Sequence, residues 1–353
     1  MKLGISCHSL KHSGGTERYA MDLVRGLHDE QLLPTFFARR LDKLIPEYAM
    51  VEPCEIETHW VPGKLRDALF SLLLSRQKRK FNIAVLIACN RTTVSDIAIC
   101  GGTHRGYLNA THRSAKWSDK WQIRLETKHY QHAKIIIAHS ELMAKELIEY
   151  YAIPANKIEV LYPPIDDRFS PVQAAKRQAL REMLGFPSDK FVFLFPSNSH
   201  GRKGFNLLED YFSQTDLPIV LAVAGRPVKS THPNIQFLGY RKDIENVYRA
   251  ADFTLMPSHY EPFGLIGIES VLCGTPVILA ENVACGEVLL PQAKISFQRG
   301  DPASFDKAIK TALQQKTAMQ KALINPTDSI TYDTRIKTHV KRLLAIAQTI
   351  SHP

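Results

Sequence analysis

Two apolar strands, predicted over Asp252–Met256 and Thr275–Ala280, are separated by a short loop and a helix over about residues 264–273. Gly274 follows the last predicted helical residue, at the position where glycine ends many helices. A strand, a helix and a second strand in immediate succession are typical of parallel sheets that carry helices on their faces. This unit therefore indicates an α/β architecture.

The same alternation of apolar strands and helical stretches extends along the whole chain. Further strands are predicted over Lys2–Cys7, Pro34–Ala38, Cys54–Val61, Phe81–Cys89, Asp96–Cys100, Lys134–Ala138, Ile158–Leu161, Phe191–Phe195, Pro218–Ala224 and Ile235–Leu238. Helices are predicted over Thr16–His28, Lys64–Lys80, Pro171–Leu184, from Asp301 onward and over Thr331–Ile350. Strands that alternate with helices in this way predict doubly wound parallel sheets.

The chain is long enough for two domains, since it has 353 residues, of which 44% are hydrophobic and 23% are charged. The segment Leu161–Arg168 contains two adjacent prolines, Pro163 and Pro164. Adjacent prolines make a stiff, extended connector, because the ring fixes φ and also restricts the preceding residue. We therefore predict a first domain over residues 1–163 and a second over residues 164–330.

Two glutamates bracket the start of the helix between the first two strands. Glu261 lies on the loop, and Glu269 lies about one and a half turns into the helix. The first backbone N–H groups of a helix are free and favour an anion. Here they belong to Phe263, Gly264, Leu265 and Ile266. This pattern suits a sugar, a diphosphate and a ribose bound in a row.

A second anion site is predicted after the strand over Phe191–Phe195. There, Arg202 and Lys203 directly precede Gly204 and the start of a helix. A strand, a glycine-bearing loop and two cations before a helix form a phosphate site on physical grounds. The alternative is an ordinary pair of basic residues on the surface.

The segment Glu-Pro-Phe-Gly-Leu-x3-Glu-x4-Gly-Thr-Pro-Val, residues 261–277, resembles the Glu-x7-Glu motif of retaining glycosyltransferases of family 4. This resemblance implies the GT-B fold, in which two Rossmann-like domains face a central cleft. It implies that Glu269 binds the ribose and Glu261 the donor sugar, and that Lys203 neutralises the leaving diphosphate. It also implies that a last helix, within residues 331–353, crosses back to the first domain.

Other short segments resemble family 4 more loosely. Catalytic roles are implied for His104, Arg202, Lys203 and Glu261. Donor contacts are implied for Gly14, Gly15, Arg202, Lys203, Gly239, Tyr240, Glu261, Phe263, Gly264, Leu265, Ile266 and Glu269, and acceptor contacts for Glu17, Arg18, Arg105 and Tyr107. For the glycine pair the alternative is a plain strand-to-helix turn, which Ser13 or Thr16 could cap. For His104 it is an ordinary loop histidine.

Many family 4 members place an arginine where this chain has Asn198, whereas here Arg202 directly precedes Lys203. Together with the Tyr-Pro-Pro connector at Tyr162, this variant resembles lipopolysaccharide core glucosyltransferases. We therefore expect a UDP-sugar donor and a phosphorylated glycan or glycolipid acceptor of the cell envelope. Three alternatives stay open: a UDP-sugar epimerase, a transferase for capsule, exopolysaccharide or another glycolipid, and a non-catalytic binder of anionic surfaces. No Gly-x-Gly-x-x-Gly follows the first strand, which argues against a nicotinamide dehydrogenase.

The net charge of +10 indicates an anionic partner. Residues 101–134 contain seven Lys or Arg against two acids, with Trp117 and Trp121 among them. The helix over Lys64–Lys80 repeats leucines at helical spacing and ends in basic residues. Either stretch could meet an anionic membrane, although the second could equally be a helix packed on the sheet. Nucleic acid is disfavoured, because no nucleic-acid motif is present.

The six cysteines form no Cys-x-x-Cys pair, and no Asp-x-Asp motif occurs. We therefore expect neither a metal nor a cofactor, so that protein cations stabilise the leaving diphosphate. No signal peptide and no apolar run of membrane-spanning length is recognised. The expected location is cytoplasmic, at the inner face of the cytoplasmic membrane.

Overall fold

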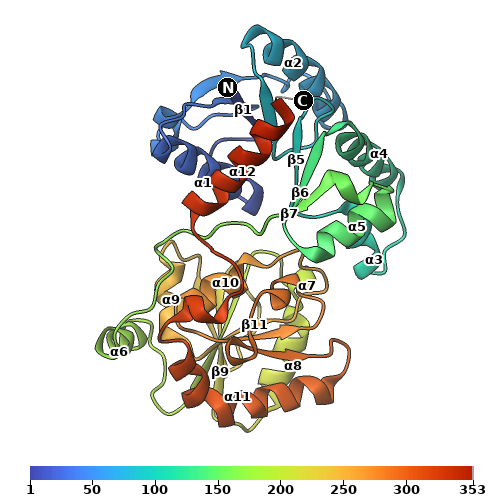
Figure 1. The fold of residues 1–353 in the computed structure, drawn as a ribbon. Helices are drawn as coiled ribbons and strands as arrows, with labels where there is room; N and C mark the ends of the chain where they lie inside the picture. The colour runs from blue at the N-terminus through green and yellow to red at the C-terminus, as the bar shows by residue number, and fades with distance from the viewer. Residues whose placement is uncertain (352–353) are drawn as a thin grey trace. The chain divides into compact units, whose positions relative to one another are not determined.

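The computed structural model describes residues 1–351, apart from the side chain of Lys64, and consists of two compact units. The N-terminal unit comprises Met1–Asp166 and the chain from Thr334 onward, and the C-terminal unit comprises Asp167–Asp333 (Figure 1). Each unit is built on one parallel sheet with helices around it. The predicted α/β class, with two Rossmann-like units, is thus confirmed.

The N-terminal sheet has seven strands in the order β3-β2-β1-β4-β5-β6-β7, and every pairing in it is parallel. The strands are β1 (Leu3–Ser6), β2 (Thr35–Ala38), β3 (Glu52–Glu55), β4 (Val85–Ala88), β5 (Ile97–Cys100), β6 (Ile135–Ala138) and β7 (Ile158–Val160). All residues of β1, β2, β4 and β5 are buried. Fully buried strands fit a sheet that is covered on both faces, which explains their unbroken apolar runs.

The helices of this unit are α1 (Gly15–Asp29), α2 (Arg66–Lys80), α3 (His104–Ala110), α4 (Trp117–His132), α5 (Glu141–Tyr151) and α12 (Ile336–Ser351). The last helix of the chain packs on the first, at Gly26 of α1. A Cβ atom at Gly26 would lie 2.5 Å from Cγ2 of Val340 and 2.7 Å from Cγ2 of Ile336. The missing side chain therefore permits the close approach of α1 and α12.

Three local predictions for this unit are wrong. The strand expected over Cys54–Val61 is β3 at Glu52–Glu55, on the edge of the sheet. The first residue before α1 is Gly14, and no side chain caps the helix there. The leucines that repeat over the predicted helix Lys64–Lys80 do not share one buried face, because Leu65 and Leu72 are exposed, whereas Leu73 packs against the buried Phe70 and Leu74. Tertiary packing on the sheet decides which face of a helix is covered.

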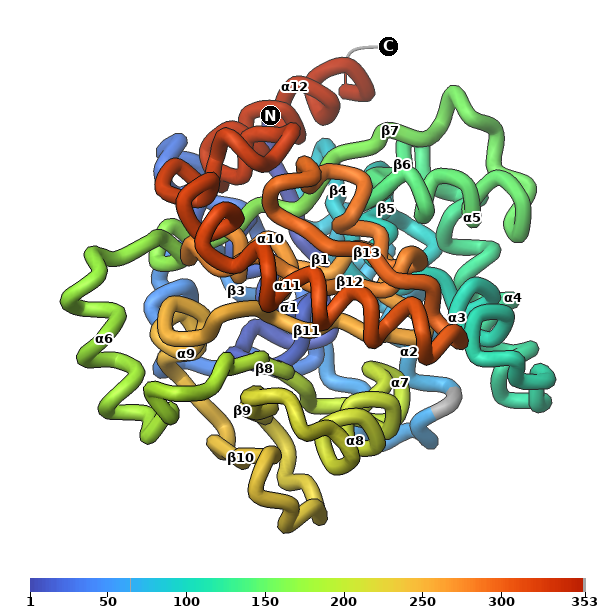
Figure 2. The backbone as a smooth tube through the Cα atoms, turned by 90° about the horizontal axis from the view of Figure 1, so that it is seen from below, coloured from blue at the N-terminus to red at the C-terminus, as the bar shows by residue number. Residues whose placement is uncertain are grey.

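The C-terminal sheet has six parallel strands in the order β10-β9-β8-β11-β12-β13. They are β8 (Phe191–Ser197), β9 (Ile219–Gly225), β10 (Ile235–Gly239), β11 (Phe253–Met256), β12 (Val277–Ala280) and β13 (Lys294–Phe297). The helices are α6 (Ala174–Met183), α7 (His200–Lys203), α8 (Phe205–Gln214), α9 (Ile244–Ala250), α10 (Leu265–Leu272) and α11 (Pro302–Ala322). Figure 2 shows α7 and α8 beside β8 and β9. Asp301 caps α11, since its side chain accepts a hydrogen bond from the Ala303 N–H.

The strand order puts the topological switch point of the C-terminal sheet between β8 and β11. From β8 the chain winds outward through β9 and β10, and it then returns to the other side of β8 at β11. Ligands of doubly wound sheets bind at such switch points, beyond the carboxyl ends of the strands. The loops that follow β8 and β11 carry Lys203 and Glu261.

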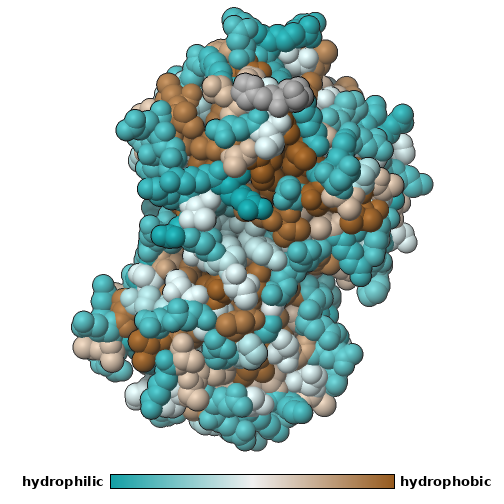
Figure 3. All heavy atoms as spheres, in the orientation of Figure 1, coloured by the Kyte–Doolittle hydropathy of each residue, from teal (hydrophilic) through white to brown (hydrophobic). Residues whose placement is uncertain are grey.

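Hydrophilic residues cover most of the surface visible in Figure 3.

Candidate active site

The loops after β8 and β11 touch each other at Gly204. This glycine has φ +80°, and a Cβ atom on it would lie 2.2 Å from the carbonyl oxygen of Pro257. Only glycine combines that backbone conformation with that contact at little cost. The position at which α7 passes into α8 is therefore held directly against the start of the loop that leads to Glu261.

Arg202 ties the two loops together by side chain and by backbone. Its Nη1 donates to the carbonyl oxygen of Tyr260 at 2.7 Å and lies 3.3 Å from Oε2 of Glu261. Its own carbonyl accepts from the His259 N–H at 2.9 Å. The structure thus brings together Arg202 and Glu261, two of the residues that the sequence predicted for the site. In this structure the arginine orients the carboxylate.

Lys203 is partly buried, and its Nζ lies 3.4 Å from the carbonyl oxygen of Pro196 at the carboxyl end of β8. Burial lowers the pKa of this amine, and the charges of Glu261 and Glu269 act in the opposite direction. Within residues 1–351, Lys203 makes no ion pair. A half-buried ammonium close to two carboxylates, and paired with neither, leaves positive charge available for a bound anion.

Glu269 is buried on α10, where Oε2 accepts a hydrogen bond from the hydroxyl of Tyr248 at 3.0 Å. The helix begins at Leu265 after Gly264, which has φ +99°, and no side chain caps it. A Cβ atom at Gly267 would lie 2.6 Å from Sγ of Cys285. Glycines therefore let the first turn of α10 sit against Cys285. No side chain caps the N–H groups of this turn, which are the ones that an anion can accept from.

Two further residues predicted to contact the donor, Gly239 and Tyr240, lie at the end of β10. Gly239 has φ +73°, and the register of β10 on β9 shifts between Phe237 and Gly239. Tyr240 follows with 74% of its surface exposed. An exposed aromatic ring beside an irregular strand end is open to stacking against a planar ligand.

In the N-terminal unit, His104 is the first residue of α3, and Thr103 caps that helix. Nε2 of His104 lies 2.9 Å from a carboxylate oxygen of Asp119, and its backbone N–H donates to Glu126 at 2.9 Å. The sequence analysis did not identify Asp119 or Glu126 as site residues, because it treated them only as the two acids in a basic stretch. The sequence does hold one sign that Asp119 has a structural role, since it stands three residues after Lys116. Its carboxylate accepts a hydrogen bond from the Lys116 N–H at the start of α4.

The other predicted residues of this unit lie in two places. Gly14 and Gly15 begin α1, with Glu17 and Arg18 half-buried in its first turn. No atom lies within 4 Å of a Cβ atom built on Gly15, so the structure gives no steric reason for that glycine.

Arg105 and Tyr107 lie on α3, and both already have partners. The guanidinium of Arg105 lies 5.4 Å from the ring centre of Tyr151, and Arg113 donates to the hydroxyl of Tyr107 at 3.1 Å. An acceptor contact by either side chain would therefore add to these interactions or replace them.

Comparison with known proteins identifies the family. The model named Glycosyltransferase Family 4 matches residues 13–169, and the model named Glycosyl transferases group 1 matches residues 176–327. A probable transglycosylase of Burkholderia thailandensis is 47% identical over 352 residues, which cover 98% of this chain and 97% of that protein. The chain belongs to the family 4, group 1 glycosyltransferases.

More distant relatives match part of this glycosyltransferase. A mannosylfructose-phosphate synthase of Agrobacterium fabrum is 32% identical over 185 residues, which cover 45% of this chain and 40% of that protein. Among solved structures, WaaG, a glycosyltransferase involved in lipopolysaccharide biosynthesis, superposes with a TM-score of 0.83 at 14% identity, covering 99% and 100% of the two chains. Anabaena HepE in complex with UDP has a TM-score of 0.78 at 16% identity, with coverage of 99% and 100%. These similarities establish the GT-B fold.

Residues 1–351 of the glycosyltransferase contain neither a cluster of metal ligands nor a helix suited to span a membrane. No group of three or more His, Cys, Asp or Glu side chains is placed to hold a metal ion in this part of the chain. None of its helices is long and apolar enough to cross a membrane.

Proposed function

We propose that this glycosyltransferase moves a sugar from a UDP-sugar to a phosphorylated glycan or glycolipid of the cell envelope, with retention of anomeric configuration. The observation that carries the donor proposal is the cluster of Arg202, Lys203, Glu261 and Glu269 at the switch point of the C-terminal sheet. Cations and a helix start suit a diphosphate, and carboxylates suit hydroxyl groups.

In this proposal each residue of the cluster has one task. Glu269 holds the ribose, and Lys203 with the N–H groups at the start of α10 binds the diphosphate. Glu261, oriented by Arg202, holds the sugar. As the bond from sugar to phosphate breaks, negative charge grows on the departing diphosphate. Fixed positive charge stabilises that change without reorganisation, which would make the reaction independent of a metal.

The names of similar proteins, and the ligands crystallised with them, support the choice of UDP and of a phosphorylated acceptor. HepE has been crystallised with UDP and with UDP-glucose. Several partial relatives are D-inositol 3-phosphate glycosyltransferases, among them one from Mycolicibacterium smegmatis, 31% identical over 165 residues. A phosphorylated acceptor also fits the net charge of +10. Lipopolysaccharide core is the acceptor that we favour, and WaaG acts in lipopolysaccharide biosynthesis.

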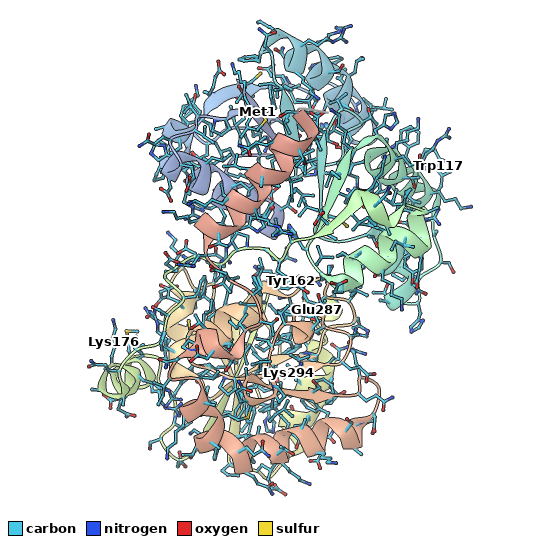
Figure 4. All side chains as sticks on the ribbon, viewed as in Figure 1. Met1, Trp117, Tyr162, Lys176, Glu287 and Lys294 are labelled. Atoms are coloured by element: carbon cyan, nitrogen blue, oxygen red, sulfur yellow. The ribbon has the colours of Figure 1, made fainter. Side chains whose placement is uncertain are left out.

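We further propose that the protein works at the inner face of the cytoplasmic membrane. Trp117 begins α4 with 69% of its surface exposed, at the outer side of the N-terminal unit (Figure 4). Lys116, Lys120 and Arg124 lie on or next to the same helix. An exposed tryptophan among cations suits the headgroup region of an anionic bilayer. Sedimentation with vesicles of anionic lipid, at low and at high salt, would test this.

The nearly full-length relative is called a probable transglycosylase, which suggests a second function, in which the donor is a glycan without a nucleotide. The decisive experiment offers UDP-, GDP- and ADP-sugars, or a nucleotide-free oligosaccharide, and measures released nucleotide and transferred sugar. UDP release that requires acceptor supports the transferase, whereas transfer from the oligosaccharide alone supports the alternative. UDP release without any acceptor would favour hydrolysis or epimerisation.

The phosphate role of Lys203 has a matched control. Lys203→Met should lower transfer by roughly two orders of magnitude, the effect of losing one transition-state charge contact. Lys310→Met removes an equal charge, which pairs with Asp306 on α11, and should leave transfer unchanged. Unchanged activity of Lys203→Met would contradict the proposal.

A further inference from the structure

Arg299 follows β13 and reaches back to the loop that carries Glu261. Its Nε donates to the carbonyl oxygen of Pro257 at 3.0 Å, and its Nη2 donates to Nε2 of His259. The arginine is half-buried, and burial lowers the pKa of its guanidinium. Two directed bonds from one planar group hold a backbone atom and a side chain of the loop in a single geometry.

The contact with His259 also defines the state of that histidine. A guanidinium has only donors, so Nε2 of His259 must accept and must carry no proton. His259 is therefore neutral, with its proton on Nδ1. A protonated ring would place two cations in contact, and the bond between Arg299 and His259 would be lost.

The rest of the loop is held from two other directions. Asn282, which follows β12, donates from Nδ2 to the carbonyl oxygens of Ser258 and His259 at 3.2 and 2.7 Å. On the opposite side, the His259 N–H donates to the carbonyl oxygen of Arg202. The loop after β11 is thus fixed by chain segments that follow β8, β12 and β13, and the last residue that Arg299 contacts, His259, lies two positions before Glu261.

We propose that Arg299, through His259, is a positioning residue that holds the Glu261 carboxylate in register with the donor sugar. This inference rests on the proposed function, in which Glu261 contacts the sugar. The hydrogen bonds of Arg299 go to Pro257 and His259, whereas Glu269 accepts from Tyr248 and Lys203 lies against the carbonyl of Pro196. Loss of Arg299 should therefore disturb the sugar end of the donor and spare its nucleotide end.

The test compares UDP affinity by calorimetry with kcat and donor KM for transfer from UDP-glucose, or from the sugar nucleotide that proves active. For Arg299→Met and His259→Leu we expect kcat to fall roughly 10- to 100-fold, the size of effect that a displaced catalytic contact has. UDP affinity and donor KM should change by less than about threefold. Lys310→Met, with an equal loss of charge on α11, should match the wild type.

A conservative variant separates positioning from simple folding damage. In His259→Gln, the amide oxygen can still accept from Arg299, so this variant should retain at least about a third of the wild-type kcat. Equal loss of kcat in His259→Gln and His259→Leu would overturn the proposal. A parallel loss of UDP affinity and kcat in Arg299→Met would also overturn it, because that pattern indicates general damage to the unit.

Failure of the inference and failure of the proposed function give different results. If the wild-type protein binds no UDP and releases none from any donor, the proposed function itself fails. If the wild type is active and Arg299→Met transfers sugar at the wild-type rate, the function stands and the positioning role is wrong.

Discussion

The hydroxyl of Tyr248 donates to one oxygen of the buried Glu269 carboxylate, and this orients the carboxylate that we propose to bind the ribose. In Tyr248→Phe that buried oxygen loses a donor, which costs about 1 kcal/mol in stability. We expect UDP affinity to fall by roughly five- to tenfold, because the carboxylate is no longer oriented before binding. Isothermal titration with UDP would measure this, and an unchanged affinity would show that Tyr248 has no part in nucleotide binding.

Gly267 tests the packing under α10. A Cβ atom there would lie 2.6 Å from Sγ of Cys285 and 3.2 Å from Sδ of Met256, and both residues are buried. Gly267→Ala should therefore lower the free energy of unfolding by roughly 1–3 kcal/mol, the usual cost of overpacking a core. Gly201→Ala is the control, since nothing lies within 4 Å of its Cβ position.

Urea denaturation would measure both alanine variants. The prediction fails if Gly267→Ala is as stable as Gly201→Ala, for which no loss is expected.

Helices α3, α4 and α5 of the N-terminal unit converge on one buried carboxylate. Glu126 of α4 accepts from the His104 N–H of α3, from the hydroxyl of Tyr151 of α5, and from Arg91 in the loop after β4. Charge-assisted bonds of this kind are strong where water is excluded. Because Glu126 holds the backbone of His104, this contact also sets where that predicted catalytic residue lies.

Replacement of this carboxylate should loosen the three helices together. Glu126→Gln leaves Arg91 without its anionic partner, which should cost roughly 3–5 kcal/mol, the usual effect of breaking a buried ion pair. Hydrogen exchange should speed up in α3 and α4 first. Glu149→Gln, which removes an exposed partner of Lys145, should change stability by less than about 1 kcal/mol. Equal exchange in the two variants would contradict the role assigned to Glu126.

Most elements could be predicted from the sequence, and the exceptions have physical causes. Strand β13 was missed because Lys294–Phe297 is short and lies at the sheet edge, with only Phe297 buried. The leucines of the helix predicted over Lys64–Lys80 repeat at helical spacing, yet Leu65 and Leu72 are exposed. Periodicity reports which residues share a face, but packing on a particular sheet selects the face that is buried.

At the scale of the whole molecule, three buried histidines link folding to pH. Burial lowers the pKa of His129 to about 4, of His139 to about 3 and of His339 to about 4. In the unfolded chain a histidine titrates near pH 6.5. Below that pH the unfolded state binds more protons than the folded state, so stability is lost as the pH falls from about 7 toward 4.

Between pH 7 and pH 5, each buried histidine should remove roughly 1–2 kcal/mol from the free energy of unfolding. Urea titrations over this range would measure the slope. His129→Gln should flatten it, whereas His59→Gln, at an exposed position, should leave it unchanged. A slope that is the same in the wild type and His129→Gln would refute the assignment.

His339 also shows how the end of the chain becomes part of the first domain. Its Nε2 lies 2.8 Å from the hydroxyl of Tyr19 on α1, and its Nδ1 lies 3.0 Å from the carbonyl oxygen of Tyr162 in the connector. For the neutral ring, Nδ1–H donates to the carbonyl and Nε2 accepts from Tyr19. A single side chain of α12 thus joins the first helix to the segment that leaves the N-terminal unit.

The alternation of strands and helices, and the segments after the strands that carry Lys203, Glu261 and His104, could be predicted from the sequence. It could do so because apolar periodicity, glycines and prolines act over a few neighbouring residues. The fold in three dimensions was needed to show which side chains meet: Arg202 with Glu261, Tyr248 with Glu269, Arg299 with His259 and Asp119 with His104. Three of these contacts depend on the placement of β11 between β8 and β12 or on the packing of α9 against α10, and the fourth on the meeting of α3 with α4. Long-range order of this kind leaves no trace in local periodicity.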